Sequence, residues 1–176
     1  MNICIRSITP EDNAAVAALI RATLTEFNCV GEGFAYADPE LDTMYEATVA
    51  QADSCFWVLE NTLTQEIVGC GGLSRLKGSS EQEAICELQK FYFLPQTRGQ
   101  GLGSRLLGLA IEQATALGYR RMYLETVPQM AQALHVYRKF GFQDLSGPLG
   151  NTGHHRCTRF MALTLGVPCL SSATVE

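Results

Sequence analysis

The segment "LQKFYFLPQTRGQGLGSRLL", residues 88–107, decides the fold because a glycine-rich turn joins an aromatic strand to a leucine-rich helix. Gly99, Gly101 and Gly103 occupy alternate positions in this turn. Such a turn exposes unpaired backbone N–H groups at the positive end of the helix dipole, and glycine lets a ligand lie against the main chain. A tight turn alone needs one glycine rather than three. The pattern therefore indicates a site for an anion, with phosphate or pyrophosphate as the expected ligand.

The composition describes a globular chain with an acidic balance. Its 176 residues suit one domain with a sizeable core, and 47% of them are hydrophobic and 18% charged. The net charge is -5 and there is no lysine- or arginine-rich run, so a nucleic-acid partner is not favoured, whereas a cationic amine is compatible. No apolar run approaches the roughly 18 residues of a membrane span, and no secretory leader begins the chain. We expect a cytoplasmic protein with no membrane partner.

The cysteine pattern does not indicate disulfides or a metal site. Seven cysteines are scattered through apolar segments, without CxxC pairs or the cysteine and histidine spacings of zinc sites. His154, His155 and Cys157 lie close together but supply too few ligands at suitable spacing. We expect reduced cysteines, mostly in the core, and no metal.

Hydrophobic periodicity predicts an α/β (α+β mixed) fold. A glycine- and aspartate-rich segment around residues 31–46 reads as a mobile loop on the substrate side. The expected elements, in chain order, are a strand at 3–8, a helix after Pro10, a short helix at 40–51, strands at 55–61, 66–76 and 84–94, a helix at 101–117, a strand at 120–127, a helix at 128–140 and two final strands. This order predicts a mixed, mostly antiparallel sheet of about six to seven strands with about four helices. Residues 1–165 would form the domain and residues 166–176 a tail.

Two common phosphate-binding motifs fit the turn less well. A P-loop needs Gly-Lys-Ser/Thr at the start of the helix, but Leu102, Gly103 and Ser104 follow Gly101, so no lysine can reach a terminal phosphate. A dinucleotide-binding fingerprint is GxGxxG in an early βαβ unit, whereas this GxGxG motif lies in mid-chain after the expected antiparallel strands. NAD binding stays as the weaker alternative.

With these residues the sequence resembles the GNAT superfamily of N-acetyltransferases. The family's acetyl-CoA signature, Arg/Gln-x-x-Gly-x-Gly/Ala, is met by "RGQGLG" at 98–103, after "FYFLP". A second block, "ALHVYRKFGF" at 133–142, is similar to the family's helix-borne tyrosine followed by Gly-Phe. The resemblance covers roughly residues 3–165. It implies the GNAT acyl-CoA N-acyltransferase fold, in which the two central strands splay apart around the pantetheine arm.

The resemblance also implies an acetyl-CoA site made largely of main-chain groups. The strand residues Phe91, Tyr92 and Phe93 would border the cofactor, with the backbone of Phe91 and Phe93 bonding the thioester carbonyl and the pantetheine amides. A fixed N–H aimed at that carbonyl stabilises the charge that develops there during attack. The phenylalanine rings themselves are expected in the core. The pyrophosphate would be held by the N–H groups of Arg98, Gly99, Gln100, Gly101, Leu102, Gly103 and Ser104.

Glu87 is the candidate general base. A branch of the family carries its base at the corresponding position, and an acceptor amine must lose a proton before it can attack. Apolar neighbours such as Ile85 and Leu88 would raise the pKa of Glu87. Two other readings stay open: Glu87 acts through a water, or it is an ordinary ion-pair partner or solvent-facing residue. Cys86 should point to the opposite face of the strand, which argues against an acetyl-cysteine route.

Tyr137 is the candidate general acid. The resemblance places it where its hydroxyl can donate to the departing CoA sulfur. A core tyrosine packed against the sheet is the alternative. Many members of the family have a cofactor-contacting asparagine seven positions earlier, but this sequence has Met130. That contact is therefore absent or is supplied by Gln129 or Gln132.

The sequence gives less information about the residues that bind the acceptor. In this fold the early loop and the late hairpin border the acceptor, which makes Glu32, Tyr36, Asn151 and His154 the candidate substrate-binding residues. Acidic groups would attract a cationic amine, and His154 would contact a carboxylate or act as an auxiliary base. The alternative is that these residues belong to ordinary surface loops and bind no substrate.

The resulting prediction is an N-acetyltransferase that moves acetyl from acetyl-CoA to a primary amine of a small molecule, amino acid or peptide. Attack would be direct, in a ternary complex. The alternative is a non-catalytic CoA-binding sensor or assembly module. A homodimer is compatible with the sequence, and fold membership does not select the acceptor.

Overall fold

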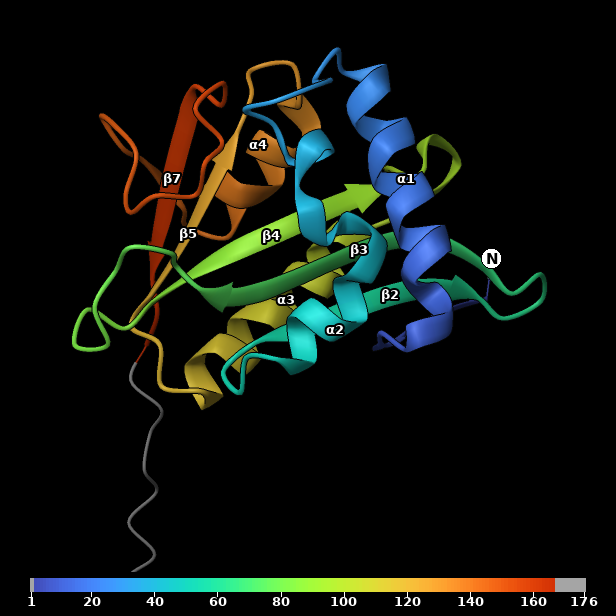
Figure 1. The fold of residues 1–176 in the computed structure, drawn as a ribbon, viewed down its shortest axis with the longest axis horizontal. Coiled ribbons are helices and arrows are strands. Elements are labelled where there is room, and N and C mark those ends of the chain that lie inside the picture. The colour runs from blue at the N-terminus through green and yellow to red at the C-terminus, as the bar shows by residue number, and fades with distance from the viewer. Residues whose placement is uncertain (1, 167–176) are drawn as a thin grey trace, which may run out of the picture.

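The computed structural model describes residues 2–166, so the predicted tail, apart from Gly166, lies outside the described residues. These residues build one seven-stranded sheet with the order β1-β2-β3-β4-β5-β7-β6 (Figure 1). Neighbouring strands are antiparallel except β4 and β5, which are parallel. The prediction of a mixed, mostly antiparallel sheet is therefore confirmed. The strands are β1 Ile3–Ser7, β2 Cys55–Asn61, β3 Glu66–Arg75, β4 Ile85–Phe93, β5 Arg121–Thr126, β6 Gln143–Asp144 and β7 Arg159–Thr164.

Helices cover both faces of the sheet. Figure 1 shows α1 and α2 on the near face, with α3 and α4 behind the sheet. Alternation along the strands divides the core accordingly: Trp57 and Leu59 pack in the cluster that includes α3 and α4, whereas Phe56 and Val58 pack in the cluster that includes α1. Within residues 2–166 the α-helices are α1 Asn13–Glu26, α2 Met44–Val49, α3 Leu102–Ala116 and α4 Ala131–Lys139.

The two parallel strands at the centre splay apart. Ile85–Glu87 of β4 pair with Arg121–Tyr123 of β5. Beyond this point β5 pairs only with β7, and β4 continues to Phe93 beside β3. The divergence is visible in Figure 1 where β4 turns away from β5. The splayed pair implied by the family resemblance is therefore present.

A bulge in β4 accompanies the splay. Gln89 pairs with Gly72 of β3, and Tyr92 pairs with Cys70, so β4 has one more residue than β3 between these pairs. Lys90 lies in this stretch and has φ 52°, in the left-handed region that non-glycine residues rarely adopt. A bulge bends its strand and increases the local twist. It therefore turns the end of β4 away from β5.

The early loop differs from the prediction of a mobile segment. Phe34 and Leu41 are buried, and short 3-10 turns form at Ala35–Ala37 and Pro39–Thr43. The expected helix at 40–51 is correspondingly shorter and begins as α2 at Met44. Burial of apolar side chains outweighs the glycine and aspartate signals, which describe only local backbone preference.

Candidate active site

Two cavities with shared lining residues lie at the splay, and the smaller one is lined by residues of both core clusters. The smaller, of about 50 Å³, is lined by residues of β4 and β5 together with Tyr137. The larger, of about 660 Å³, extends beneath α2 and the end of β3. Both are lined by Glu87, Gln89, Lys90 and His154. Glu87 thus stands where the gap between the strands opens into a space large enough for a second substrate.

The glycine-rich turn needs two of its glycines for backbone reasons. Gly99 and Gly101 have φ 74° and 77°, in the left-handed region that favours glycine. The expectation that a tight turn needs one glycine is therefore wrong. Gly103 lies within α3, and a Cβ built on it would be 3.7 Å from the Phe93 ring, an ordinary contact. Because Gly103 has no side chain, the main chain at the start of the helix is uncovered.

The turn presents unused main-chain donors. Among residues 2–166, the N–H groups of Gly99–Ser104 have no hydrogen-bond acceptor, whereas the N–H of Arg98 donates to the carbonyl of Pro95 at 3.2 Å. Free N–H groups at the start of a 15-residue helix favour an anion. The turn therefore fits a diphosphate group, with Arg98 as the one predicted residue whose N–H is already used.

Arg98 fastens this turn to its surroundings. Its guanidinium forms two hydrogen bonds with the carboxylate of Glu26, at 2.6 and 2.8 Å, and lies over the ring of Phe27, 5.3 Å from the centroid. Its Nε donates to the carbonyl of Phe93 at 2.9 Å. The side chain thus joins the end of α1, the end of β4 and the turn, and holds the free N–H groups in one arrangement.

Replacing Gly101 by Ala should weaken binding of CoA at least about tenfold, because a residue with a Cβ disfavours φ 77° and the turn must distort. The matched control is Gly108→Ala in the middle of α3, where a Cβ would lie 4.0 Å from Phe140. That change should leave binding unaltered and stabilise the protein by about 0.5–1 kcal/mol. Calorimetric titration with CoA and thermal unfolding measure both effects. Equal affinity for the two variants would contradict a role for the turn.

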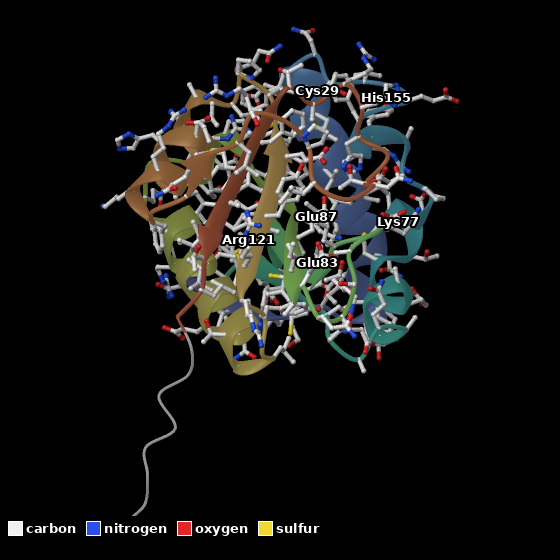
Figure 2. The ribbon with its side chains drawn as sticks, turned by 90° about the vertical axis from the view of Figure 1, so that its left-hand side faces the viewer. Cys29, Lys77, Glu83, Glu87, Arg121 and His155 are labelled. Atoms are coloured by element: carbon white, nitrogen blue, oxygen red, sulfur yellow. The ribbon has the colours of Figure 1, made fainter. Side chains whose placement is uncertain are left out.

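Glu87 is buried, with 7% of its surface exposed. Burial raises its pKa, which nearby His154 and Lys90 oppose and the like charge of Glu125 supports. Its Oε2 accepts a hydrogen bond from Nε2 of Gln89 at 3.1 Å. A solvent-facing role is therefore excluded, and a buried carboxylate with a raised pKa has the property required of a general base. Figure 2 shows Glu87 at mid-height in the molecule, with Lys77 to its right and His155 farther away near the top.

Cys86 lies on the other face of the strand, as predicted. It is fully buried in the core cluster that includes α3, and its Sγ lies 3.5 Å from the carbonyl of Arg121. Burial raises the pKa of its thiol to about 12, so it is a poor nucleophile.

Tyr137 is a core residue that also borders the smaller cavity. Its ring packs against Phe91 and Phe142, with centroid distances of 6.1 and 5.7 Å, so it belongs to the core. The residue also lines the smaller cavity together with Glu87. Its hydroxyl has no hydrogen-bond partner within residues 2–166, and burial raises its pKa, which keeps the proton in place. Glu87 and Tyr137, 50 positions apart by number, thus meet at one cavity.

The aromatic residues of β4 place their rings as expected. Phe91 and Phe93 pack edge to face, 5.1 Å between centroids, against the cluster that includes α3, and Tyr92 packs on the opposite cluster. After the splay these residues have β3 on one side and no strand on the β5 side. On that side the carbonyl of Phe93 accepts the hydrogen bond from Nε of Arg98, and no strand covers the remaining main-chain groups.

Met130 occupies the N-cap of α4 and lines the smaller cavity. Its sulfur accepts a hydrogen bond from Oγ1 of Thr126 at 3.6 Å. Gln129 and Gln132 are exposed and line neither cavity. An apolar, polarisable side chain therefore stands at the place of the family's asparagine.

Of the four predicted acceptor residues, the structure brings one to the cavities. His154 lines both of them. Glu32 is exposed, Tyr36 packs on the α1-side cluster, and the N–H of Asn151 donates to the carbonyl of Lys77 at 2.7 Å. None of these three lines either cavity, so their assignment stays a prediction.

Sequence reasoning missed Gln89 and Lys90 as residues of the site. Both line the two cavities, and Lys90 is almost completely buried. A signal was present: two adjacent polar residues interrupt the apolar strand "LQKFYF", a pattern that fits a bulge better than regular alternation.

A splayed parallel pair followed by a turn of free N–H groups is the arrangement expected of an acyltransferase of the acyl-CoA-binding type. The model described as the acetyltransferase (GNAT) family matches residues 17–142. The chain belongs to that family, as its signature predicted.

Known relatives agree with this membership. Over 153 residues the chain is 41% identical to the uncharacterized N-acetyltransferase YjgM of Escherichia coli K12, a match that spans 86% of this chain and 89% of the relative. An acetyltransferase of the GNAT family from Staphylococcus aureus Mu50 has a similar structure, with a TM-score of 0.79 at 23% identity over 94% of this chain and 100% of that one. The structure of yncA from Salmonella typhimurium, with its cofactor acetyl-CoA, matches with a TM-score of 0.72 at 21% identity over 98% and 99% of the chains. The structural matches confirm the fold.

Two kinds of feature were not found among the described residues. Within residues 2–166, no group of three or more His, Cys, Asp or Glu side chains is arranged to hold a metal ion. None of the helices described in that range is long and apolar enough to cross a membrane.

Proposed function

We propose that the protein transfers the acetyl group of acetyl-CoA to a primary amine of a small-molecule acceptor by direct attack in a ternary complex. The observation that carries the proposal is the position of Glu87, which lines both the gap between β4 and β5 and the larger cavity beside it. A base at that boundary serves an acceptor in the larger cavity and an acyl donor in the gap. The acetyl-CoA found with the Salmonella yncA structure supports the choice of donor.

The donor supplies a thioester, whose acyl group is already activated. The free N–H groups of Gly99–Ser104 would hold its diphosphate, and the open side of Phe91 and Phe93 would align the arm that leads to the sulfur. Glu87 takes the proton that the acceptor's ammonium group must lose before its nitrogen can attack. Tyr137 keeps its proton and donates it, or a hydrogen bond, toward the leaving sulfur. The main chain and two side chains then account for positioning, proton removal and departure of the leaving group.

A thiol-release assay with acetyl-CoA and a panel of primary amines tests the proposal. Free CoA should appear only when a suitable amine is present, and the acetylated amine should be recoverable by mass spectrometry. Calorimetric binding of CoA without release for any amine would instead support the non-catalytic CoA-binding module. Quenching or enhancement of NADH fluorescence, without CoA binding, would favour the dinucleotide alternative. The cytoplasmic location and the homodimer stay predictions.

A further inference from the structure

One carboxylate, that of Asp38, joins three segments that are distant in the sequence. Its Oδ2 accepts a hydrogen bond from Nζ of Lys90, in the β4 bulge. The same oxygen lies 2.9 Å from Nε2 of His154, and Oδ1 lies 3.1 Å from that nitrogen. His154 belongs to the loop between β6 and β7, residues 145–158, called the late loop. Asp38 itself belongs to the early loop, just before Pro39. The early loop, the bulge and the late loop are therefore fastened together at this one residue.

The charges of this cluster are buried beside Glu87. The Lys90 side chain is only 3% exposed, and its Nζ also lies 3.4 Å from Glu40. Burying a cation is costly unless it is paired, and the two carboxylates satisfy that need. His154 lines both cavities together with Glu87. The cluster thus forms one wall of the place where the acceptor amine would be deprotonated.

Contacts of the residues that follow His154 also hold the late loop against the early loop. The N–H of Arg156 donates to the carbonyl of Gly33 at 3.2 Å, and its guanidinium lies over the ring of Phe34, 4.3 Å from the centroid. A Cβ on Gly33 would approach the His155 ring to 2.7 Å, so the two loops are in close contact there. The loop that carries His154 is therefore held against the early loop, whereas the imidazole itself bonds Asp38.

Polar and titratable groups from three elements face Glu87. β4 supplies Gln89 and Lys90, β5 supplies Tyr123 and Glu125, and the late loop supplies His154 and Cys157. Burial and Glu125 oppose the charged form of Glu87, whereas the cations favour it. Burial and the like charge of Lys90 lower the pKa of His154, but its hydrogen bond to Asp38 and the charges of Asp38 and Glu87 outweigh them and leave the pKa raised.

We propose that Asp38 and His154 are positioning residues: Asp38 holds an imidazolium of His154 beside Glu87, so that the Glu87 carboxylate stays charged and can accept the proton of the acceptor amine. Before the reaction the Glu87–His154 pair carries one proton, on His154. The acceptor ammonium gives a second proton to Glu87, and its nitrogen keeps the electron pair that attacks the thioester. This inference rests on the proposed function of Glu87 as the base.

The first test measures the coupling without turnover. The chain has three histidines, so each imidazole can be assigned in a carbon-13-labelled full-length protein from His→Gln variants. The pKa of His154 should lie above its ordinary value of about 6.5 and should fall by about one unit or more in Asp38→Asn. It should also fall in Glu87→Gln, because two interacting groups shift each other reciprocally. No change of the His154 titration in Glu87→Gln would overturn the proposal.

The second test measures the pH dependence of kcat/KM. In His154→Gln the acid limb should move about one unit to higher pH, since Glu87 loses a neighbouring cation. His154→Lys, which keeps a positive charge, should restore the limb. His155→Gln, next to it on the same loop, is the matched control and should not move it. An unmoved limb in His154→Gln, with thermal unfolding and CoA binding unchanged, would contradict the proposal.

The two tests separate this inference from the proposed function. If no amine supports CoA release but the histidine titration shows the coupling, the proposed function fails and the Glu87–His154 pairing stands. If the enzyme turns over and the coupling is absent, only the role of His154 is lost.

Discussion

Replacing Glu87 by Gln is expected to lower kcat/KM by about 10²–10⁴-fold, the range over which a general base usually contributes. Glutamine keeps the size of the side chain but cannot accept the ammonium proton. Binding of CoA should not change, because the turn at Gly99–Ser104 lies at the far end of β4. The thiol-release assay measures the rate, and calorimetry measures the affinity.

The pH dependence of this variant distinguishes a lost base from a damaged site. As the pH approaches the pKa of the acceptor amine, more of the amine is already neutral and the need for Glu87 diminishes, so the deficit should shrink. The matched control is Glu83→Gln, an exposed residue whose Oε2 accepts a hydrogen bond from the N–H of Ser80 at 2.7 Å. The control should turn over normally. A deficit of the same size at every pH would argue against proton abstraction.

Replacing Tyr137 by Phe is expected to lower kcat by about 100-fold with little effect on the KM for acetyl-CoA. The ring contacts with Phe91 and Phe142 remain, and the lost hydroxyl has no hydrogen-bond partner within the described residues. Thermal stability should therefore stay close to that of the parent protein. Steady-state kinetics and thermal unfolding measure both quantities.

A second buried tyrosine provides the control for this change. The Tyr119 hydroxyl donates to the carbonyl of Asp53 at 2.9 Å, so Tyr119→Phe should cost about 1 kcal/mol of stability without affecting kcat. Tyr137→Phe should therefore lower kcat without changing stability, whereas Tyr119→Phe should lower stability without changing kcat. If Tyr137→Phe had the same kcat as the parent enzyme, a different group would have to donate the proton to the leaving sulfur.

Local patterns in the sequence predicted most of the fold. Strand β2 has the predicted bounds, Cys55–Asn61, and Gly118 and Gly141 follow the ends of α3 and α4 as expected of helix-terminating glycines. The start of α4 was predicted three positions early, because Pro128 suits a first helical turn but the helix begins only after Met130. Glu87 and Tyr137 were found through the family resemblance, and the structure brings them to one cavity.

The sequence by itself determined the glycine turn, the order of strands and helices and the family, since these depend on neighbours within a few positions along the chain. Only the tertiary structure decided that Asp38 bonds Lys90 and His154, 52 and 116 positions away, and that a bulge turns Lys90 into the site. Those contacts depend on the register between β3 and β4 and on where two loops meet. Register is set by packing of the whole sheet, and a buried charge is tolerated only where such packing brings it a partner.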